Sequence, residues 1–406
     1  MPNKDRNIPK RRFKAFENAD AWELRKLGEC SSLITKGTTP RDKSGVGDVN
    51  FVKVENLVNG EILPLQKIQL EEHEGYLKRS QLVENDILFS IAGTLGRTAV
   101  VKKSILPANT NQALSIIRGY EFNKNFLVTI LRGNVIKEFI KKNPTIGAQP
   151  NLSLEQVSNL CFSAPCTEEQ SAIGTFFSTL DRQITLHQRK LDKLKNVKQA
   201  YLSEMFPAEG ERVPKRRFPG FTDDWELRKL GEVADVFDGT HQTPRYTNQG
   251  VMFLSVEDIN TLESEKYISS EDFEKEFKVF PEFNDVLMTR IGDIGTSNIV
   301  KTNDKIAYYV SLALIKPKKL ESHFLNSIIQ SKDFQNELWK RTLHIAFPKK
   351  INKGEISEVN LKFPSLPEQK AIGTFFSTLD QQITLHQRKL EKLKNLKKAL
   401  LNELFV

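Results

Sequence analysis

The chain has 406 residues, of which 39% are hydrophobic and 27% are charged. This length allows two or three domains, and a mean hydropathy of −0.42 fits a chain that buries sizeable cores. No stretch reaches the roughly 18 uninterrupted apolar residues of a membrane span, and residues 1–14 are polar and basic, unlike a secretory signal. The composition therefore argues against membrane and secreted proteins and predicts a cytoplasmic one.

The net charge of +9 fits a polyanionic partner, although charge alone does not identify one. Cys30, Cys161 and Cys166 are too few for a disulfide framework, and none of them forms a CxxC pair. Cys161 and Cys166 could share a metal, but no His or Cys stands near them in the sequence to complete a tetrahedral set. We expect reduced thiols and no metal site.

The dominant feature is an internal duplication. From Glu169 the chain reads EQSAIGTFFSTLDRQITLHQRKLDKLKNVKQAYLSEMF, and from Glu368 it reads EQKAIGTFFSTLDQQITLHQRKLEKLKNLKKALLNELF. About 30 of these 38 positions are identical, at an offset of 199 residues. A second repeat reads KRRFKAFENADAWELRKLGE from Lys10 and KRRFPGFTDDWELRKLGE from Lys215. The chain is therefore two tandem copies of one unit.

Between these repeated ends, residues 33–165 and 236–365 match only in outline. Runs of β-branched and aromatic residues predict strands in the first middle segment at 50–54, 86–90, 98–101 and 114–117, and helical spacing covers 125–141. In the second middle segment, strands are predicted at 252–256, 285–289, 298–300 and 310–315, and helical spacing covers 322–342. One framework with two different surfaces is expected.

Each repeated C-terminal end predicts a helix of about 40 residues with apolar side chains in alternating steps of four and three. The seam residues are Ile173, Phe177, Leu180, Ile184, Leu191 and Leu194 in the first copy, and Ile372, Phe376, Leu379, Ile383, Leu390 and Leu393 in the second. A 3.5-residue repeat of this kind must pack on another helix. An antiparallel pair needs no long return of the intervening chain, so we favour it; a coiled coil between two molecules is the alternative.

Polar loops rich in Arg, Lys, Gln, Asn and Thr interrupt the predicted strands, and these residues suit base edges and phosphates. The candidate DNA-binding residues are Thr38, Arg41, Lys43, Arg97, Lys141, Lys142, Asn151, Thr240, Gln242, Arg245, Arg290, Ser297, Lys349 and Lys350. For any single loop the alternative is an ordinary hydrophilic turn. No phosphate-binding GxxxxGK[ST] loop, GxSxG or HExxH motif is present, so no catalytic residue is predicted.

The layout resembles the specificity (S) subunit of type I restriction–modification systems over nearly the whole chain. The resemblance rests on the EQxAI, LDxxI and KLxxLK elements of the repeated helix, on WExxKLGE at the start of each half, and on GTTP and GTHQTP. It implies an α+β protein with two β-rich target-recognition domains joined by two long helices that form an antiparallel coiled coil. It also implies two halves of a bipartite double-stranded DNA site, whose spacer the helices set.

The same resemblance implies two methyltransferase subunits and restriction subunits as partners. S-adenosylmethionine, ATP and Mg are then expected on those partners, with no cofactor and no catalysis in this chain. The expected domains are 1–165 and 208–365 for target recognition, and 166–207 and 366–406 for the spacer helices. The alternatives are a stand-alone DNA-binding or coiled-coil scaffold protein and, with least support, an enzyme acting alone on DNA.

Overall fold

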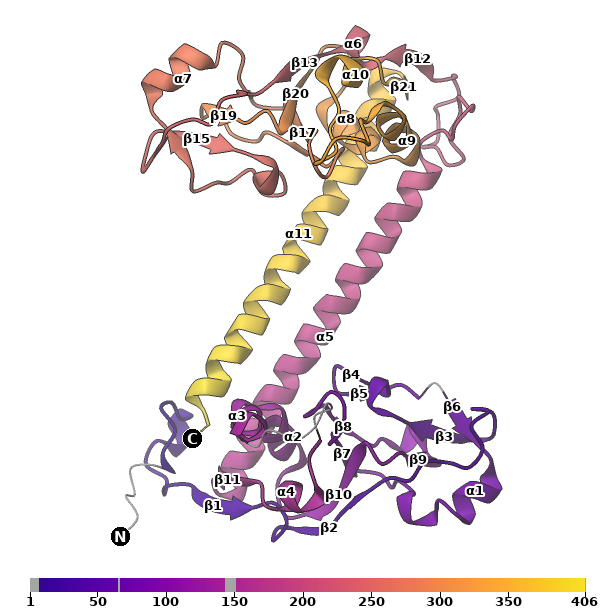
Figure 1. Ribbon diagram of the computed structural model, residues 1–406, viewed down its shortest axis with the longest axis vertical. Helices are drawn as coiled ribbons and strands as arrows, with labels where there is room; N and C mark the ends of the chain where they lie inside the picture. The colour runs from indigo at the N-terminus through magenta and orange to yellow at the C-terminus, as the bar shows by residue number, and fades with distance from the viewer. Residues whose placement is uncertain (1–6, 65, 143–150, 406) are drawn as a thin grey trace. The chain divides into compact units, whose positions relative to one another are not determined.

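The structure, a computed structural model, describes residues 7–64, 66–142 and 151–405. The chain forms two compact units (Figure 1): the first unit contains Met1–Gln188 and Arg388–Val406, and the second unit contains Arg189–Gln387. Each unit therefore holds one variable middle segment together with parts of both long helices.

A four-stranded antiparallel sheet lies at the centre of each unit, in the order β2-β10-β7-β8 in the first and β13-β20-β17-β18 in the second. In the first unit the strands are Ser31–Lys36 (β2), Leu114–Tyr120 (β10), Ile87–Ser90 (β7) and Thr98–Val100 (β8). In the second unit they are Ala234–Asp238 (β13), Leu312–Pro317 (β20), Val286–Thr289 (β17) and Ser297–Ile299 (β18).

A smaller sheet contributes further strands to each unit: β6-β3-β9 in the first and β14-β16-β15-β19 in the second. Their bounds are Val49–Val52 (β3), Gln66–Ile68 (β6), Ala108–Thr110 (β9), Tyr246–Thr247 (β14), Val251–Leu254 (β15), Tyr267–Ile268 (β16) and Ile306–Tyr308 (β19). Two-stranded ribbons complete the set: Glu23–Lys26 (β1) with Cys161–Ala164 (β11), Glu226–Lys229 (β12) with Asn360–Phe363 (β21), and Leu57–Val58 (β4) with Glu61–Ile62 (β5).

The α-helices of the first unit are Leu70–Glu74 (α1), Lys124–Arg132 (α2), Asn134–Lys142 (α3), Leu154–Ser158 (α4), the first part of Thr167–Glu204 (α5) and the end of Leu366–Glu403 (α11). The second unit has Leu230–Val233 (α6), Ser270–Glu276 (α7), Ser322–Ile329 (α8), Lys332–Arg341 (α9), Lys353–Ser357 (α10), the end of α5 and the first part of α11.

The central sheet of each unit is covered on both faces, which explains the apolar run in its middle strand. In β7, Ile87 and Phe89 pack with the helices α2 and α5, whereas Leu88 packs with the smaller sheet. In β17, Val286 and Met288 likewise face the helices and Leu287 faces the smaller sheet. The alternation follows from the two-residue period of a strand.

The eight strands predicted from the sequence are all present, each overlapping its predicted range. The helical spacing at 125–141 and 322–342 is confirmed, and each range holds two helices, α2 and α3 in the first unit and α8 and α9 in the second. Gly133 is extended and ends α2. Ser331 caps α9 through its hydroxyl, which accepts a hydrogen bond from the Phe334 backbone N–H at 3.4 Å, and so a new helix begins there.

The two long helices pack antiparallel within each unit. In the first unit, Ile173 and Phe177 near the start of α5 share a core with Leu400 and Leu404 near the end of α11. In the second unit, the end of α5 supplies Leu202 and Met205, which pack with Ile372 and Phe376 near the start of α11. The remaining predicted seam residues are buried or half-buried. The predicted fold class, with its antiparallel helix pair, is therefore confirmed.

Charged side chains reinforce this pairing in the same way in both units. The Lys397 ammonium lies 2.5 Å from the Asp181 carboxylate in the first unit, and Lys198 lies 2.5 Å from Asp380 in the second.

No helix in the described part of the chain is both long and apolar enough to cross a membrane.

The repeated segments that begin each half form a buried ion pair with the start of a long helix. In the first unit the Arg12 guanidinium donates to both carboxylate oxygens of Glu169, at 2.8 and 2.6 Å. In the second unit Arg217 donates to Glu368 in the same way, at 2.7 Å to each oxygen. The hydrogen bond to Glu368 raises the pKa of Arg217. Both members of each pair belong to the repeated sequence, and they attach the start of each half to a helix.

The glutamine that follows each of these glutamates binds the variable domain. Gln170 donates to the Pro165 carbonyl at 2.9 Å and accepts from the Asn123 backbone N–H at 3.0 Å, just before α2. Gln369 makes the same two bonds to the Pro364 carbonyl and the Glu321 backbone N–H, both at 2.9 Å. The repeated Glu-Gln pair therefore fixes the helix to both ends of its domain.

Candidate nucleic-acid interface

The register of the central sheet brings separate loops together at one end. In the first unit Lys36 pairs with Ser115, and Ser90 pairs with Leu114. The chain therefore leaves β2 and β7, and enters β8 and β10, at the same end of the sheet. In the second unit the pairs Asp238–Ala313 and Thr289–Leu312 produce the same arrangement. We call this end, in each unit, the loop end of the sheet.

The loop between β7 and β8 carries Arg97 to the loop end of the first unit. Asn151 pairs with Ala92 at the start of the same loop, in an isolated β-bridge. Helix α3 lies against Gly96, since a Cβ there would be 3.3 Å from the Ile140 side chain. The helix ends at Lys142, so Lys141 and Lys142 lie near this loop, and both are exposed. Residues 143–150, between Lys142 and Asn151, lie outside the described residues.

The loop that follows β2 carries Thr38, Arg41 and Lys43. The Thr38 hydroxyl accepts a hydrogen bond from Arg79 Nε at 3.1 Å, and Arg41 lies 4.3 Å above the centre of the Tyr76 ring. Arg41 and Lys43 are exposed. Between them, hydrogen bonds from the Ser44 backbone and hydroxyl lower the pKa of Asp42. Arg79 was not among the predicted residues, because it lies 41 residues from Thr38 along the chain.

In the second unit the loop after β13 presents Thr240, Gln242 and Arg245. The Thr240 carbonyl accepts from the Val310 backbone N–H at 2.9 Å, which holds the start of the loop at the loop end. Gln242 and Arg245 are exposed. Among the residues that the structure describes, Arg245 has no carboxylate partner, so its guanidinium is open to a ligand.

Two predicted contact residues are turned into the protein instead. Arg290 is only 5% exposed: its guanidinium forms an ion pair with Asp238 and donates to the Ile351 carbonyl at 3.0 Å. The prediction that Arg290 contacts DNA is therefore not supported. The half-buried Ser297 hydroxyl donates to Asn326 on α8 at 2.8 Å. Asp238 also accepts a hydrogen bond from the Tyr308 hydroxyl through its carbonyl, at 3.0 Å, and burial raises the pKa of Tyr308.

Lys349 and Lys350 reach the loop end of the second unit through backbone pairing. The Gly292 N–H donates to the Lys349 carbonyl at 2.8 Å, and the Leu343 N–H donates to the Lys350 carbonyl at 2.8 Å. Both lysine side chains are exposed. The loop end of the second unit therefore collects residues from three segments that are distant in sequence.

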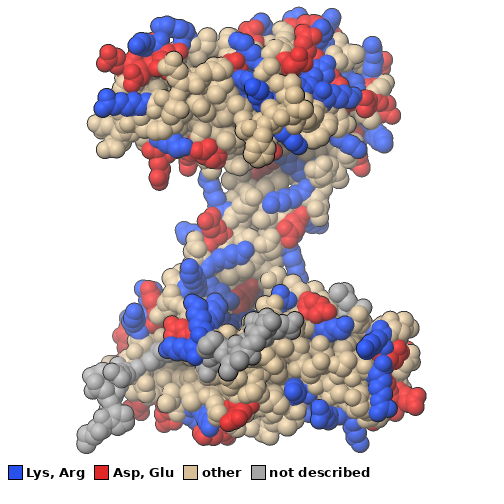
Figure 2. Space-filling model, viewed as in Figure 1, with Lys and Arg blue, Asp and Glu red and all other residues tan. Residues whose placement is uncertain are grey.

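Figure 2 shows Lys and Arg interspersed with Asp and Glu over the face in view, and not gathered into one basic stripe. A polyanion would therefore be attracted to this face by individual Lys and Arg side chains and not by one extended basic surface. In the described parts of the chain, no group of three or more His, Cys, Asp or Glu side chains is arranged to hold a metal ion.

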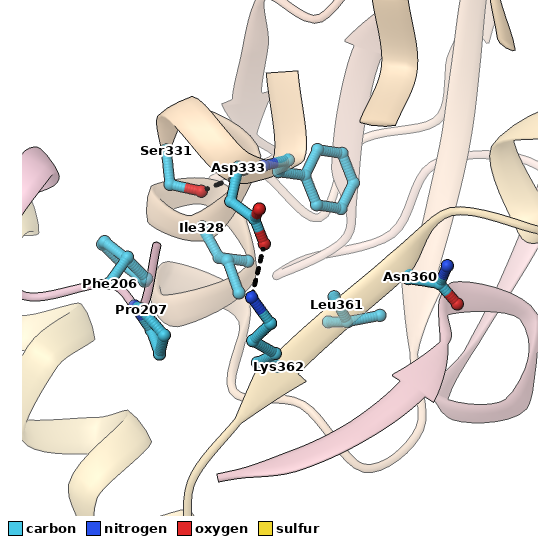
Figure 3. A pocket seen from close by; sticks show the side chains of 9 residues that line it. Phe206, Pro207, Ile328, Ser331, Asp333, Asn360, Leu361 and Lys362 are labelled. Carbon is cyan, nitrogen blue, oxygen red and sulfur yellow. Dashed lines mark hydrogen bonds and ion pairs between the residues drawn. The ribbon is translucent and has the colours of Figure 1, made fainter. Parts of the chain in front are cut away.

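A pocket between α9 and β21 in the second unit does not look like a ligand site (Figure 3). Phe206, Ile328 and Leu361 supply apolar walls. Lys362 donates to the Asp333 carboxylate at 3.1 Å and to the Ala208 carbonyl at 2.7 Å, so its charge is already used inside the protein. The pocket is a junction where β21 packs on α9.

We expect Lys141, Lys142, Lys349 and Lys350 to contact phosphates. Changing all four to alanine should weaken binding to every DNA sequence and reduce the slope of log K against log salt by about 0.9 per lost contact. The measurement is a salt titration of DNA affinity. Lys318→Ala with Lys319→Ala is the control, since these exposed lysines follow the opposite end of β20. An unchanged slope in the fourfold variant would contradict the phosphate assignment.

Comparison with known proteins agrees with the internal repeat. The family model described as the type I restriction modification DNA specificity domain matches residues 19–196 and again residues 222–395. The MjaVIII type I restriction enzyme specificity subunit of Methanocaldococcus jannaschii is 24% identical, over 94% of this chain and 91% of its own. The EcoDI specificity subunit of Escherichia coli is 20% identical, over 75% of this chain and 74% of its own.

The fold is also that of a solved S subunit. The type I restriction-modification S subunit from M. genitalium superposes with a TM-score of 0.70 at 14% sequence identity, covering 98% of this chain and 99% of that one. The resemblance inferred from the repeated motifs is thus confirmed. With two matches that together span most of its residues, the chain belongs to the family of type I restriction modification DNA specificity domains.

Proposed function

We propose that the chain is the DNA-recognition subunit of a type I restriction–modification system, and that each unit reads one half of a bipartite double-stranded site through its loop end. One observation carries this proposal: the two loop ends have the same backbone framework but different side chains. Arg41 and Lys43 follow β2 in the first unit, whereas Gln242 and Arg245 follow β13 in the second. Two such surfaces suit two different half-sites.

Within each loop end we assign base reading to arginines and positioning to lysines. Arg41, Arg97 and Arg245 are exposed, and a guanidinium can bind the O6 and N7 atoms of guanine with two hydrogen bonds. Lysines neutralise phosphates without reading sequence. Arg290 is left out of this assignment because its donors are used by Asp238 and Ile351.

The proposal includes partners that supply the chemistry. Two modification subunits with S-adenosylmethionine would methylate adenine, and restriction subunits would use ATP and Mg to cleave. The chain itself would be non-catalytic and cytoplasmic, and its paired helices would set the spacer between half-sites. We assign it no catalytic residue and no cofactor.

Replacing residues 33–165 by the corresponding segment of a relative tests this function. We expect one half of the methylated sequence to change and the other half to stay, as read by methylome sequencing of a host carrying the complete system. The reciprocal replacement of residues 236–365 is the matched control and should change only the other half. If one replacement altered both halves, independent reading would be refuted; a chain that did not co-purify with a methyltransferase would favour the stand-alone alternative.

A further inference from the structure

The segment 343–350 exposes apolar side chains where the chain leaves α9 (orange in Figure 1). Ile345 is 99% exposed and Phe347 is 104% exposed, so neither is covered by the rest of the protein. Trp339, on α9 just before this loop, is 58% exposed. Large apolar side chains that are fully exposed in one short loop are unfavourable in water, and exposed apolar surface of this kind is typical of interaction sites.

The 343–350 loop is held in place at its base. Its first and last residues are joined by the Leu343 N–H to Lys350 carbonyl bond. The Gly292 N–H holds Lys349, and the Ile351 N–H donates to the Arg290 carbonyl at 3.0 Å. The buried Arg290 guanidinium also donates a hydrogen bond to the Ile351 carbonyl. Arg290 therefore acts as a positioning residue for this loop.

An aromatic pair supports the first part of the loop. The His344 ring packs on Trp339 with centroids 4.1 Å apart, and His344 Nε2 lies 2.9 Å from the Trp339 carbonyl. The Lys349 ammonium lies 4.7 Å above the Trp339 ring. These contacts fix both sides of the loop, and Ile345 and Phe347 are left between them.

The charge around the loop points to a polyanion. Residues 338–354 contain Lys340, Arg341, Lys349, Lys350 and Lys353 but no Asp or Glu. Lys340 and Arg341 are paired with glutamates, whereas Lys349 and Lys350 have no carboxylate partner in the part of the chain that the structure describes. An apolar tip followed by two lysines without carboxylate partners complements double-stranded DNA, in which stacked bases lie between two rows of phosphates.

We propose that the 343–350 loop inserts Phe347, with Ile345 beside it, between stacked base pairs of the half-site read by the second unit. Lys349 and Lys350, which follow the inserted side chains, then contact phosphates next to the opened step. This inference rests on the proposed function, because it requires that the second unit binds DNA. It adds a kind of contact that hydrogen-bonding residues at the loop end do not supply.

Phe347→Ala should weaken binding of the DNA site that the complex recognises by about tenfold. Loss of one base stacked on an aromatic ring lowers affinity by about this factor or more. The affinity is measured with the full chain in complex with its modification subunits. The salt slope should stay unchanged, because no cation is lost. Phe283→Ala is the matched control: Phe283 is 52% exposed but precedes β17, whereas the 343–350 loop contacts residues after that strand. Both variants should keep the wild-type melting temperature.

The insertion itself is followed with 2-aminopurine placed at single positions of the second half-site, other than the methylated adenine. Wild-type complex should raise the fluorescence at one base step, and Phe347→Ala should abolish that rise. If the wild type binds its site specifically and Phe347→Ala changes neither affinity nor fluorescence, the insertion is refuted while the proposed function stands. If Phe347→Ala instead reduces the amount of modification subunit that co-purifies, the loop contacts protein and the DNA assignment is wrong. A wild-type complex without sequence preference would refute the proposed function itself.

Discussion

Arg217→Ala should lower the free energy of unfolding of the second unit by about 3–5 kcal/mol, because it leaves a buried carboxylate without its partner. The Glu368 side chain is 1% exposed and receives both of its short hydrogen bonds from Arg217. The same guanidinium also donates to the Asp223 carbonyl at 2.7 Å, so the entry segment would lose a second contact. Urea denaturation followed by tryptophan fluorescence measures the change, since Trp225 lies in this core.

The neighbouring arginine provides a matched control. Arg216 also forms an ion pair, with Glu204 at 2.6 Å, but these side chains are 55% and 39% exposed. Arg216→Ala should therefore change the free energy of unfolding far less than Arg217→Ala, because solvent screens an exposed ion pair. Equal losses in the two variants would show that burial does not decide the strength of these pairs. Arg12 and Arg11 offer the same comparison in the first unit, with Glu169 buried and Glu403 partly exposed.

The repeated sequence predicted the helix pair because the 3.5-residue period can be read within one segment, and the repeat supplies a second helix with the same apolar stripe. It could not reveal that Arg12 meets Glu169, since 157 residues separate them. The repeat nevertheless held a usable signal: both members of the Arg217–Glu368 pair recur with their counterparts in the first half. Polar residues that recur in both halves outside the apolar stripe are therefore candidate partners of one another.

Arg290 shows that loop composition alone does not predict which side chains are exposed. A polar loop predicts exposure, but Arg290 and Asp238 meet because β13 and β17 flank β20 in the sheet. That neighbourhood depends on sheet order, which the loop sequence does not contain. Ile345 and Phe347 are the opposite case, because apolar side chains are expected in a core. Only the structure shows them outside it.

The split helices have a similar explanation. Residues 322–342 have continuous helical spacing, and the break at Ser331 depends on a single cap that competes with continuation of the helix. In the first unit the break falls at Gly133. A glycine within a helical pattern is tolerated, so it does not by itself predict the end of a helix.

The second large effect is expected at Gly373, where α11 passes the start of α8. Alanine normally favours a helix over glycine by about 1 kcal/mol. Here, however, a Cβ would lie 2.8 Å from the Phe324 backbone nitrogen and would collide with the Glu321 carboxylate. That carboxylate caps α8 by accepting from the Phe324 N–H at 2.7 Å. Gly373→Ala should therefore destabilise the second unit by about 1–3 kcal/mol, the usual cost of overpacking.

Gly354→Ala in α10 is the control, since a Cβ there meets nothing within 4 Å and the substitution should stabilise the unit by about 0.5–1 kcal/mol.

The dependence of stability on acid pH provides a second measurement for Gly373→Ala. Burial alone would raise the pKa of the Glu321 carboxyl group. Hydrogen bonds from His323 and the Phe324 N–H have the larger effect, so the pKa lies below its ordinary value of 4.5. The carboxylate thus stabilises the fold above that value, and this contribution is lost as the pH falls through the lower folded pKa. If Gly373→Ala displaces Glu321, the stability difference from wild type should narrow in acid; a difference that stayed constant from pH 7 downward would show that the cap is undisturbed.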